Sequence, residues 1–323
     1  MKIDPLFEPF LTGGQTLILD GGLATELEKR GYDLNDPLWS AKILLEEPEA
    51  IQQLHLGYLY AGADCIITST YQASFQGLLA RGLTHEASAD LLKFSVQLAL
   101  EARNEFWKQE SGKRSHLAPR QRPLVAASVG PYGAYLADGS EYRGDYNLDR
   151  AGLVDFHRER WHLLAGSGAD FLLCETIPSH SEALAYLALA QETPQTKIAM
   201  AFTCPDGKSI SDGTLIDKLS NKLFDYPNLI GIGINCSSPQ FVPDVIRRFE
   251  EKCDLPIIAY PNSGENWDSA NHCWTGTTHP EEFGTAVREW RRMGAAIIGG
   301  CCRTGPDHIQ AIRERLKKSN NHV

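Results

Sequence analysis

The chain has 323 residues, 42% of them hydrophobic and 22% charged, with eight cysteines and a formal net charge of −10. This composition is too apolar for a disordered protein, and a long chain of this kind needs no disulfide scaffold, so we expect reduced thiols and a cytoplasmic location. The acidic balance without a long Lys/Arg run argues against a nucleic-acid partner, and the lack of a signal-peptide pattern or of about 18 uninterrupted apolar residues argues against a membrane partner.

Short apolar runs alternate with longer helical patterns from one end of the chain to the other. This alternation is typical of βαβ units, and runs that are apolar nearly throughout indicate strands buried on both faces. The eight predicted strands are residues 16–20, 64–69, 124–129, 170–175, 197–203, 229–235, 255–260 and 295–299. The main predicted helices are residues 48–61, 87–107, 149–166, 181–192, 239–251, 280–293 and 306–317.

Eight strands, each coupled to a helix, predict a single α/β domain over residues 1–323 with the TIM (β/α)8 barrel fold. No linker rich in Pro, Gly or Ser divides the chain. A doubly wound open sheet is the alternative, but such a sheet usually has a GxGxxG turn after its first strand, and residues 20–25 read DGGLAT.

Polar residues and cysteines stand at the carboxyl ends of the predicted strands, where barrel enzymes place their sites. The set is Asp20, Thr70, Gly130, Glu175, Thr203, Asn235, Cys236, Tyr260, Asn262, Cys301 and Cys302. The sixth strand contributes Cys236 and the eighth contributes Cys301 and Cys302. Because one strand separates these two in a closed barrel, we expect the three thiols to meet.

Three thiolates suit a catalytic Zn²⁺ site, which has three protein ligands and one open position. Gly299 and Gly300 precede the vicinal cysteines and are expected to let the backbone turn so that both thiols point inward. A substrate thiol bound as fourth ligand would lose its proton yet stay nucleophilic, because three thiolates and Zn²⁺ together are anionic, and this favours alkylation over hydrolysis. The alternatives are ordinary buried cysteines or a vicinal redox pair at Cys301 and Cys302.

Other cysteines fit the metal site less well. Cys65 and Cys174 lie within predicted strands, where we expect core positions. Cys273 is either a competing ligand, because His272 and His279 lie near it in the sequence, or a thiol in a solvated loop.

The segments DGG (20–22), GINC (233–236) and GGCCRT (299–304) resemble the homocysteine S-methyltransferase family. The resemblance covers nearly the whole chain and continues through TSTYQAS (68–74), CETIPS (174–179) and YPNSGE (260–265). The segment VGPYGAYLADGSEYRGDY (129–146) resembles the bacterial and plant branch that uses S-methylmethionine rather than the branch that uses betaine. The resemblance implies a TIM barrel, a zinc ion held by the three cysteines, and methyl transfer to homocysteine to give methionine.

The resemblance also implies that Asp20, Thr70 and Glu175 surround the bound amino acid. Asn235 and Tyr260 at the same rim join them as expected substrate contacts. Carboxylates at strand ends suit an α-ammonium group or a sulfonium, although acids there also serve as helix N-terminal caps.

The fourth metal ligand is left open by the sequence. In the betaine branch an aromatic hydroxyl follows the glutamate and serves as a metal ligand, whereas Thr176 stands at this position here.

Aromatic residues near the rim suit cation–π contact with a sulfonium, or else pack in the core. They are Trp39, Tyr71, Tyr132 and Tyr260. The long loop 130–147 carries Asp138, Glu141, Arg143 and Asp145, and is either a lid over the methyl donor or a solvated loop.

The sequence therefore predicts zinc-dependent methyl transfer from S-methylmethionine to the sulfur of homocysteine, with small molecules as the partners and no catalytic side chain beyond the zinc site. One alternative keeps homocysteine and takes the methyl group from S-adenosylmethionine or another donor. The other alternative is a non-catalytic sensor that uses the vicinal thiols as a redox switch.

Overall fold

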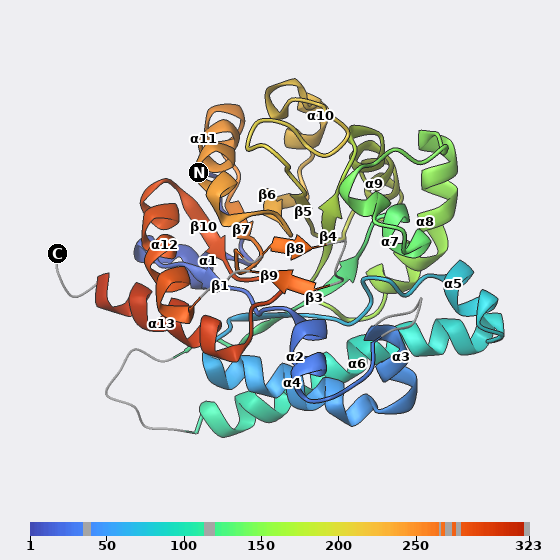
Figure 1. The fold of residues 1–323 in the computed structure, drawn as a ribbon, viewed down its shortest axis with the longest axis horizontal. Helices are drawn as coiled ribbons and strands as arrows, with labels where there is room; N and C mark the ends of the chain where they lie inside the picture. The colour runs from blue at the N-terminus through green and yellow to red at the C-terminus, as the bar shows by residue number, and fades with distance from the viewer. Residues whose placement is uncertain (35–39, 113–119, 265, 269–272, 276–278, 320–323) are drawn as a thin grey trace.

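The computed structural model describes residues 1–34, 40–112, 120–264, 266–268, 273–275 and 279–319. Eight parallel strands form one sheet in the order β1-β10-β7-β6-β5-β4-β3-β2. The sheet closes on itself because Leu19, just beyond β1, forms a parallel bridge with Cys65 of β2. The predicted TIM barrel is confirmed, and the open doubly wound sheet is wrong (Figure 1).

All eight barrel strands coincide with the predicted apolar runs. They are β1 (Leu17–Ile18), β2 (Cys65–Ile67), β3 (Leu124–Val129), β4 (Phe171–Ile177), β5 (Ile198–Phe202), β6 (Leu229–Asn235), β7 (Ile257–Tyr260) and β10 (Ala295–Ile298). Strands β3 to β6 are buried at every position, as expected of parallel strands between two apolar layers.

The predicted helices form the outer ring around the strands (Figure 1). They are α4 (Pro48–Ala61), α6 (His85–Glu110), α8 (Arg150–Ala165), α9 (His180–Glu192), α11 (Val242–Lys252), α12 (Pro280–Arg292) and α13 (Pro306–Ser319). Side chains cap the amino ends of two of these helices. The hydroxyl of Thr84 accepts from Ala87 N at the start of α6, and the carboxylate of Asp149 accepts from Gly152 N at the start of α8. The predicted helix 239–251 begins with the separate 3₁₀ turn η4 (Pro239–Phe241).

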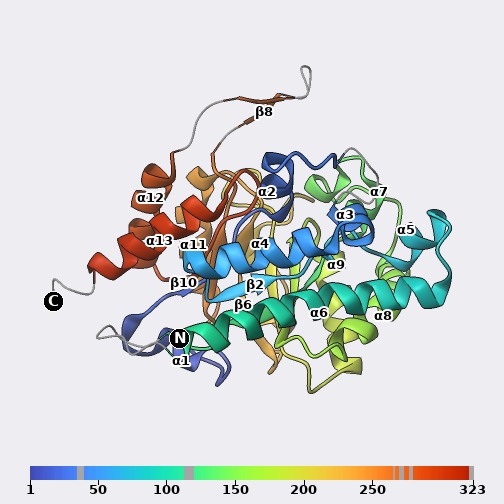
Figure 2. The same ribbon diagram turned by 90° about the horizontal axis from the view of Figure 1, so that it is seen from below.

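Short elements at the two rims lack the periodicity that predicts a helix or strand. The helical ones are α1 (Glu8–Leu11), η1 (Thr12–Gly14), α2 (Leu23–Lys29), α3 (Ser40–Glu46), α5 (Phe75–Ala80), α7 (Tyr132–Leu136), η2 (Ser140–Tyr142), η3 (Ile216–Lys218) and α10 (Asn221–Phe224). An antiparallel pair, β8 (Asn266–Asp268) and β9 (Cys273–Thr275), stands away from the barrel (Figure 2).

The inside of the barrel is a separate apolar cluster that the N-terminal segment closes at one end. Phe7, Phe10 and Leu11 pack with strand residues that face the barrel axis. The ring of Phe7 meets that of Phe171, the first residue of β4, edge to face with the centroids 5.4 Å apart. This N-terminal segment covers the barrel at the amino ends of the strands. The carboxyl ends of the strands, where barrel enzymes have their active sites, are therefore not covered by it.

The search for membrane-spanning segments covered the described helices and found none of them both long and apolar enough to cross a bilayer.

Candidate metal centre and active site

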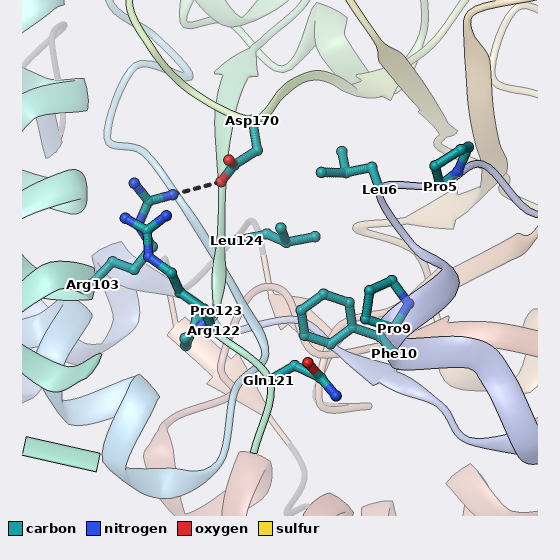
Figure 3. A pocket seen from close by; sticks show the side chains of 10 residues that line it. All are labelled: Pro5, Leu6, Pro9, Phe10, Arg103, Gln121, Arg122, Pro123, Leu124 and Asp170. Atoms are coloured by element: carbon teal, nitrogen blue, oxygen red, sulfur yellow. Dashed lines mark hydrogen bonds and ion pairs between the residues drawn. The ribbon is translucent and has the colours of Figure 1, made fainter. Parts of the chain in front are cut away.

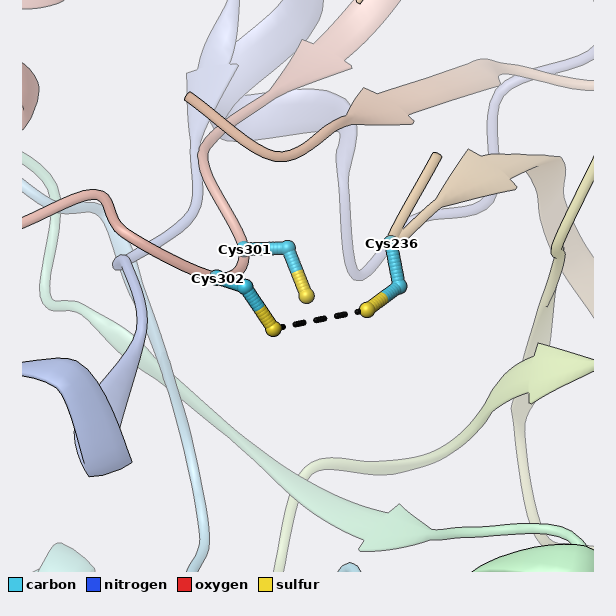
Figure 4. A group of neighbouring side chains, drawn as sticks. All are labelled: Cys236, Cys301 and Cys302. Atoms are coloured by element: carbon cyan, nitrogen blue, oxygen red, sulfur yellow. Dashed lines mark hydrogen bonds between the residues drawn. The ribbon is translucent and has the colours of Figure 1, made fainter. Parts of the chain in front are cut away.

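Three cysteine side chains converge at the carboxyl ends of the barrel strands (Figure 4). Cys236 directly follows β6, and Cys301 and Cys302 follow β10, with β7 between the two strands. Their Sγ atoms all lie within 4.8 Å of one another, and those of Cys236 and Cys302 are 3.5 Å apart. Thiolates about 2.3 Å from a tetrahedral Zn²⁺ are separated by about 3.8 Å, so the donor set fits this ion. The predicted meeting of the three thiols is confirmed.

The chain that continues β7 holds both cysteine segments in place. Cys301 N donates to Pro261 O at 2.8 Å, and Ser263 N donates to Cys302 O at 3.0 Å. On the other side, Cys236 N donates to Tyr260 O at 3.4 Å. The segment after β7 is therefore the common backbone support of the three thiols.

Left-handed backbone conformations stand at two points of the cysteine segments. Cys236 has a φ of 47° and Arg303 a φ of 66°, and Arg303 N donates to the hydroxyl of Thr25 at 2.8 Å. Gly299 and Gly300, predicted to supply the turn, are absent from the positive-φ positions. A Cβ on Gly300 would lie 2.3 Å from Thr304 Oγ1, so close packing and not an unusual φ requires the glycine.

The two glycines after β1 serve the same close packing. A Cβ on Gly22 would lie 2.6 Å from Cys301 O, and one on Gly21 would lie 2.8 Å from Thr304 O. Gly22 N donates to Thr304 O at 2.9 Å. The DGG and GGCCRT segments are therefore backbone neighbours.

Two carboxyl groups are buried beside the cysteines. Glu175 accepts from the hydroxyls of Ser128 and Tyr260, the latter at 3.2 Å, and burial raises the pKa of Glu175 to about 7. Asp20 Oδ2 accepts from Ile67 N at 2.8 Å, while Asp20 Oδ1 is buried without a partner among the described residues. Burial, and then the charge of Glu175, raise the pKa of Asp20 well above its ordinary value. A cationic ligand beside them would stabilise the ionised form of both carboxyl groups.

The other three predicted contacts, Thr70, Asn235 and Tyr260, are also buried and hydrogen-bonded to protein groups. Thr70 Oγ1 donates to Ser128 O at 2.7 Å. Asn235 accepts from Thr176 N at 2.7 Å and donates to Thr176 Oγ1 at 2.9 Å, which fixes the positive φ of 56° at Thr176. As direct substrate contacts, Thr70 and Asn235 remain predictions.

Tyr142 is a neighbour of the cysteines that sequence reasoning missed. It lies in η2, within the long loop 130–147, and its hydroxyl oxygen is 3.2 Å from Cys236 Sγ. Nothing in the sequence distinguishes this tyrosine from the others of the loop, because the contact depends on how the loop folds back over β6. The loop thus reaches the site, as the lid alternative predicts.

The predicted aromatic residues fall in different places. Tyr132 packs against other rings, with centroids 4.8 Å from Phe156 and 5.2 Å from Tyr146. Tyr260 hydrogen-bonds Glu175. Trp39 lies outside the described residues.

The sequence places two further cysteines in the core and one in a loop. Cys65 and Cys174 are fully buried, which confirms their core positions. Cys273 is the first residue of β9, and its predicted neighbour His272 lies outside the described residues. Among the residues that could be searched, Cys236, Cys301 and Cys302 form the group with metal-binding geometry.

Cys301 and Cys302 are both free cysteines, and so is Cys236. Hydrogen bonds from the thiols of Cys236 and Cys301 hold the pKa of the Cys302 thiol well below its ordinary value. One of the three sulfurs is thus already predisposed to be a thiolate, the form that binds metal.

A shallow pocket of about 300 Å³ lies at the other end of the barrel (Figure 3). Its lining includes Leu124, which begins β3, and Asp170, which precedes β4 and pairs with Arg103 at 2.8 Å. In this fold the amino ends of the strands serve stability and the carboxyl ends serve chemistry. The pocket is therefore separate from the cysteine site.

Comparison with known proteins agrees with this geometry. Residues 17–316 match the family model described as homocysteine S-methyltransferase. The chain is 48% identical over 296 residues to homocysteine S-methyltransferase YbgG of Bacillus subtilis, covering 92% of this chain and 93% of the relative. It is 45% identical over 310 residues to homocysteine S-methyltransferase 1 of Arabidopsis thaliana, covering 94% of each.

Crystal structures of a bacterial relative superpose closely on the chain. The metallated form of the homocysteine methyltransferase MmuM from Escherichia coli has a TM-score of 0.85 at 40% identity, covering 96% of this chain and 99% of the relative. The oxidized form of the same enzyme has a TM-score of 0.86 at 40% identity, covering 97% and 99%. The chain therefore belongs to the homocysteine S-methyltransferase family and is a methyltransferase.

Proposed function

We propose that the protein transfers a methyl group from S-methylmethionine to the sulfur of homocysteine, with Zn²⁺ held by Cys236, Cys301 and Cys302. The observation that carries the proposal is the convergence of three Sγ atoms within 4.8 Å at the carboxyl ends of the strands. Zn²⁺ bound there would act as a Lewis acid that keeps a substrate thiol deprotonated at neutral pH.

The side chains around the thiols suit an amino-acid acceptor. Asp20 and Glu175 are buried carboxyl groups, and the unpartnered Oδ1 of Asp20 is available to accept from an α-ammonium group. Ser128 and Tyr260 fix the orientation of Glu175 by their hydrogen bonds. The carboxylates thereby orient the acceptor, and holding both reactants in line supplies the proximity that methyl transfer needs.

The reaction balances without a further co-reactant. The methyl–sulfur bond of the sulfonium breaks as the new methyl–sulfur bond of the acceptor forms, and the proton of the acceptor thiol is released. S-methylmethionine leaves as methionine and homocysteine becomes methionine, so each turnover gives two methionines.

The test is methionine formation from homocysteine with S-methylmethionine or S-adenosylmethionine, before and after treatment with a zinc chelator. We expect turnover with S-methylmethionine, loss in chelator, and recovery when zinc is added back. Cys302→Ser should lose both bound zinc and activity. An active variant without zinc would contradict the mechanism.

S-adenosylmethionine is the alternative donor, and competition between the two donors in one assay separates them. A redox sensor built on the vicinal thiols is the alternative from another class. Stoichiometric zinc in protein purified under reducing conditions, together with turnover, would exclude it. Because the metal-binding thiols must stay reduced, we also propose a reducing compartment, the cytoplasm, and small molecules as the partners.

A further inference from the structure

A second pair of buried, unpartnered acceptor atoms lies on the segments that follow β2 and β3. Glu141 Oε2 and Gln72 Oε1 are both buried and have no hydrogen-bond partner among the described residues. Buried polar atoms in native proteins are nearly always hydrogen-bonded, so each such atom at a rim suggests a ligand. Both atoms are oxygens, and a ligand that satisfies them must donate.

Each of these residues has a contact with α7, although the two come from separate segments. Gln72 follows β2, and its Nε2 donates to Ala134 O of α7 at 3.2 Å. Glu141 belongs to η2, whose backbone packs so tightly on α7 that a Cβ on Gly133 would lie 2.3 Å from Glu141 N. The helix α7 is thus the common neighbour of both side chains.

Glu141 lies beside the three cysteines. Tyr142, next to Glu141 in the chain, places its hydroxyl 3.2 Å from Cys236 Sγ. Charge on Cys236 is also among the influences that raise the pKa of Glu141 to about 7, after the larger effect of burial. A carboxyl group in this state gains its charge when a cation binds.

We propose that Glu141 and Gln72 form a second ammonium-binding subsite, which receives the α-ammonium group of the methyl donor. This inference rests on the proposed function, in which Asp20 and Glu175 hold the acceptor. An ammonium group has three N–H donors for the two oxygens, whereas a quaternary ammonium or a bare sulfonium has none. A site built to accept from N–H groups rejects analogues that lack them, because its buried acceptors are then left unpaired. The subsite therefore selects amino-acid sulfonium donors.

The test measures binding to the zinc-loaded protein by titration calorimetry without an acceptor. The probes are S-methylmethionine and dimethylsulfoniopropionate, which has the same sulfonium and a carboxylate but no ammonium group. We expect the wild type to bind S-methylmethionine at least tenfold more tightly than dimethylsulfoniopropionate. Glu141→Gln should bring the two affinities within about threefold and raise KM for the donor, while zinc content and homocysteine affinity stay unchanged.

Matched variants show whether the effect is specific. Asp145→Asn makes the same charge change in the same loop, but Asp145 is 63% exposed and pairs with Arg143, so the preference should persist. Glu175→Gln should weaken homocysteine binding and leave the preference for S-methylmethionine over dimethylsulfoniopropionate unchanged. If Glu141→Gln does not fold, Gln72→Met tests the second acceptor by the same loss of preference.

Full preference retained in folded Glu141→Gln or Gln72→Met, or an equal loss in Asp145→Asn, would overturn the subsite. A wild type that forms methionine from S-methylmethionine but does not prefer it over dimethylsulfoniopropionate would overturn the subsite and leave the proposed function intact. A wild type that binds S-methylmethionine in a Glu141-dependent way without methylating homocysteine would overturn the proposed function and leave the subsite intact.

Discussion

At the scale of single residues, the Asn235 side chain holds Thr176 in an unfavourable backbone conformation. Thr176 keeps a φ of 56°, a region that costs a β-branched residue roughly 1–3 kcal/mol, because both atoms of the Asn235 amide bind it. Since Thr176 follows Glu175, this clamp also sets the direction of the buried carboxyl group.

Asn235→Ala should therefore destabilise the protein by about 2–4 kcal/mol, because it removes two buried hydrogen bonds and leaves Thr176 N–H unpaired. The free energy of unfolding in urea measures this. Asn235→Asp is the control, since a carboxylate can accept from both Thr176 N–H and Thr176 Oγ1–H. A loss in Asn235→Asp as large as that in Asn235→Ala would contradict the prediction, because Asp keeps both the volume of the side chain and its two hydrogen bonds.

Glu175 gives a pH dependence of stability. Its pKa rises from 4.5 to about 7 in the folded protein, mainly through burial. A raised carboxyl pKa means that the folded state binds more protons, so this contribution to stability is present below pH 4.5 and is lost as the pH rises toward 7.

We expect Glu175→Gln to reduce the fall in stability of the zinc-free protein over this window, by roughly 1–3 kcal/mol. Urea unfolding of wild type and variant at a series of pH values tests it. Parallel curves would show that Glu175 is ionised in the fold. The pKa of Asp20 is raised as well, so Asp20 contributes to the pH dependence of both proteins. The contribution of Glu175 is therefore the difference in unfolding free energy between wild type and Glu175→Gln.

At the scale of elements, the site depends on how closely three backbone segments approach one another. The segments after β1, β7 and β10 meet through Gly22, Pro261 and Cys301, with no side chain between them. Glycine is required at the contacts because a methyl group there has no space.

Gly300→Ala should shift the segment that carries Cys301 and Cys302, since its Cβ would lie 2.3 Å from Thr304 Oγ1. We expect a loss of 1–3 kcal/mol in stability, typical of overpacking, and at least a tenfold loss of zinc affinity, measured by competition with a chelator. Gly112→Ala, which has nothing within 4 Å of the new Cβ, should change neither quantity. Unchanged zinc affinity in Gly300→Ala would show that the segment tolerates the shift.

At the scale of the whole molecule, the barrel joins residues far apart in the sequence through β6 and β10, the two neighbours of β7. A metal that bridges these strands links the last strand of the chain to the middle of the sheet. Its binding free energy adds to the stability of the fold, because the unfolded chain does not hold the three thiols together.

Chelation of zinc should thus lower the midpoint of thermal unfolding by roughly 5–10 °C, as expected for a metal present at about a thousand times its dissociation constant. Cys236→Ser should unfold at the same temperature with and without chelator. A wild-type midpoint that does not respond to chelator would exclude a tightly bound structural contribution of the metal.

The sequence by itself determined the barrel and the meeting of the three cysteines at one rim, because each depends on local pattern and order along the chain. Continuous apolar runs such as residues 229–235 must be strands buried on both faces, and cysteines after the sixth and eighth strands must reach one rim once the barrel closes.

Only the tertiary structure decided how the site is supported and what covers it. That the backbone after Tyr260 holds both cysteine segments, that Asn235 clamps Thr176, and that Tyr142 reaches Cys236 all depend on approaches between distant segments. No periodicity or spacing encodes such approaches, since they arise from packing in three dimensions. For the same reason the glycines before the cysteines were assigned to a turn, whereas they provide room for Leu19 and Thr304.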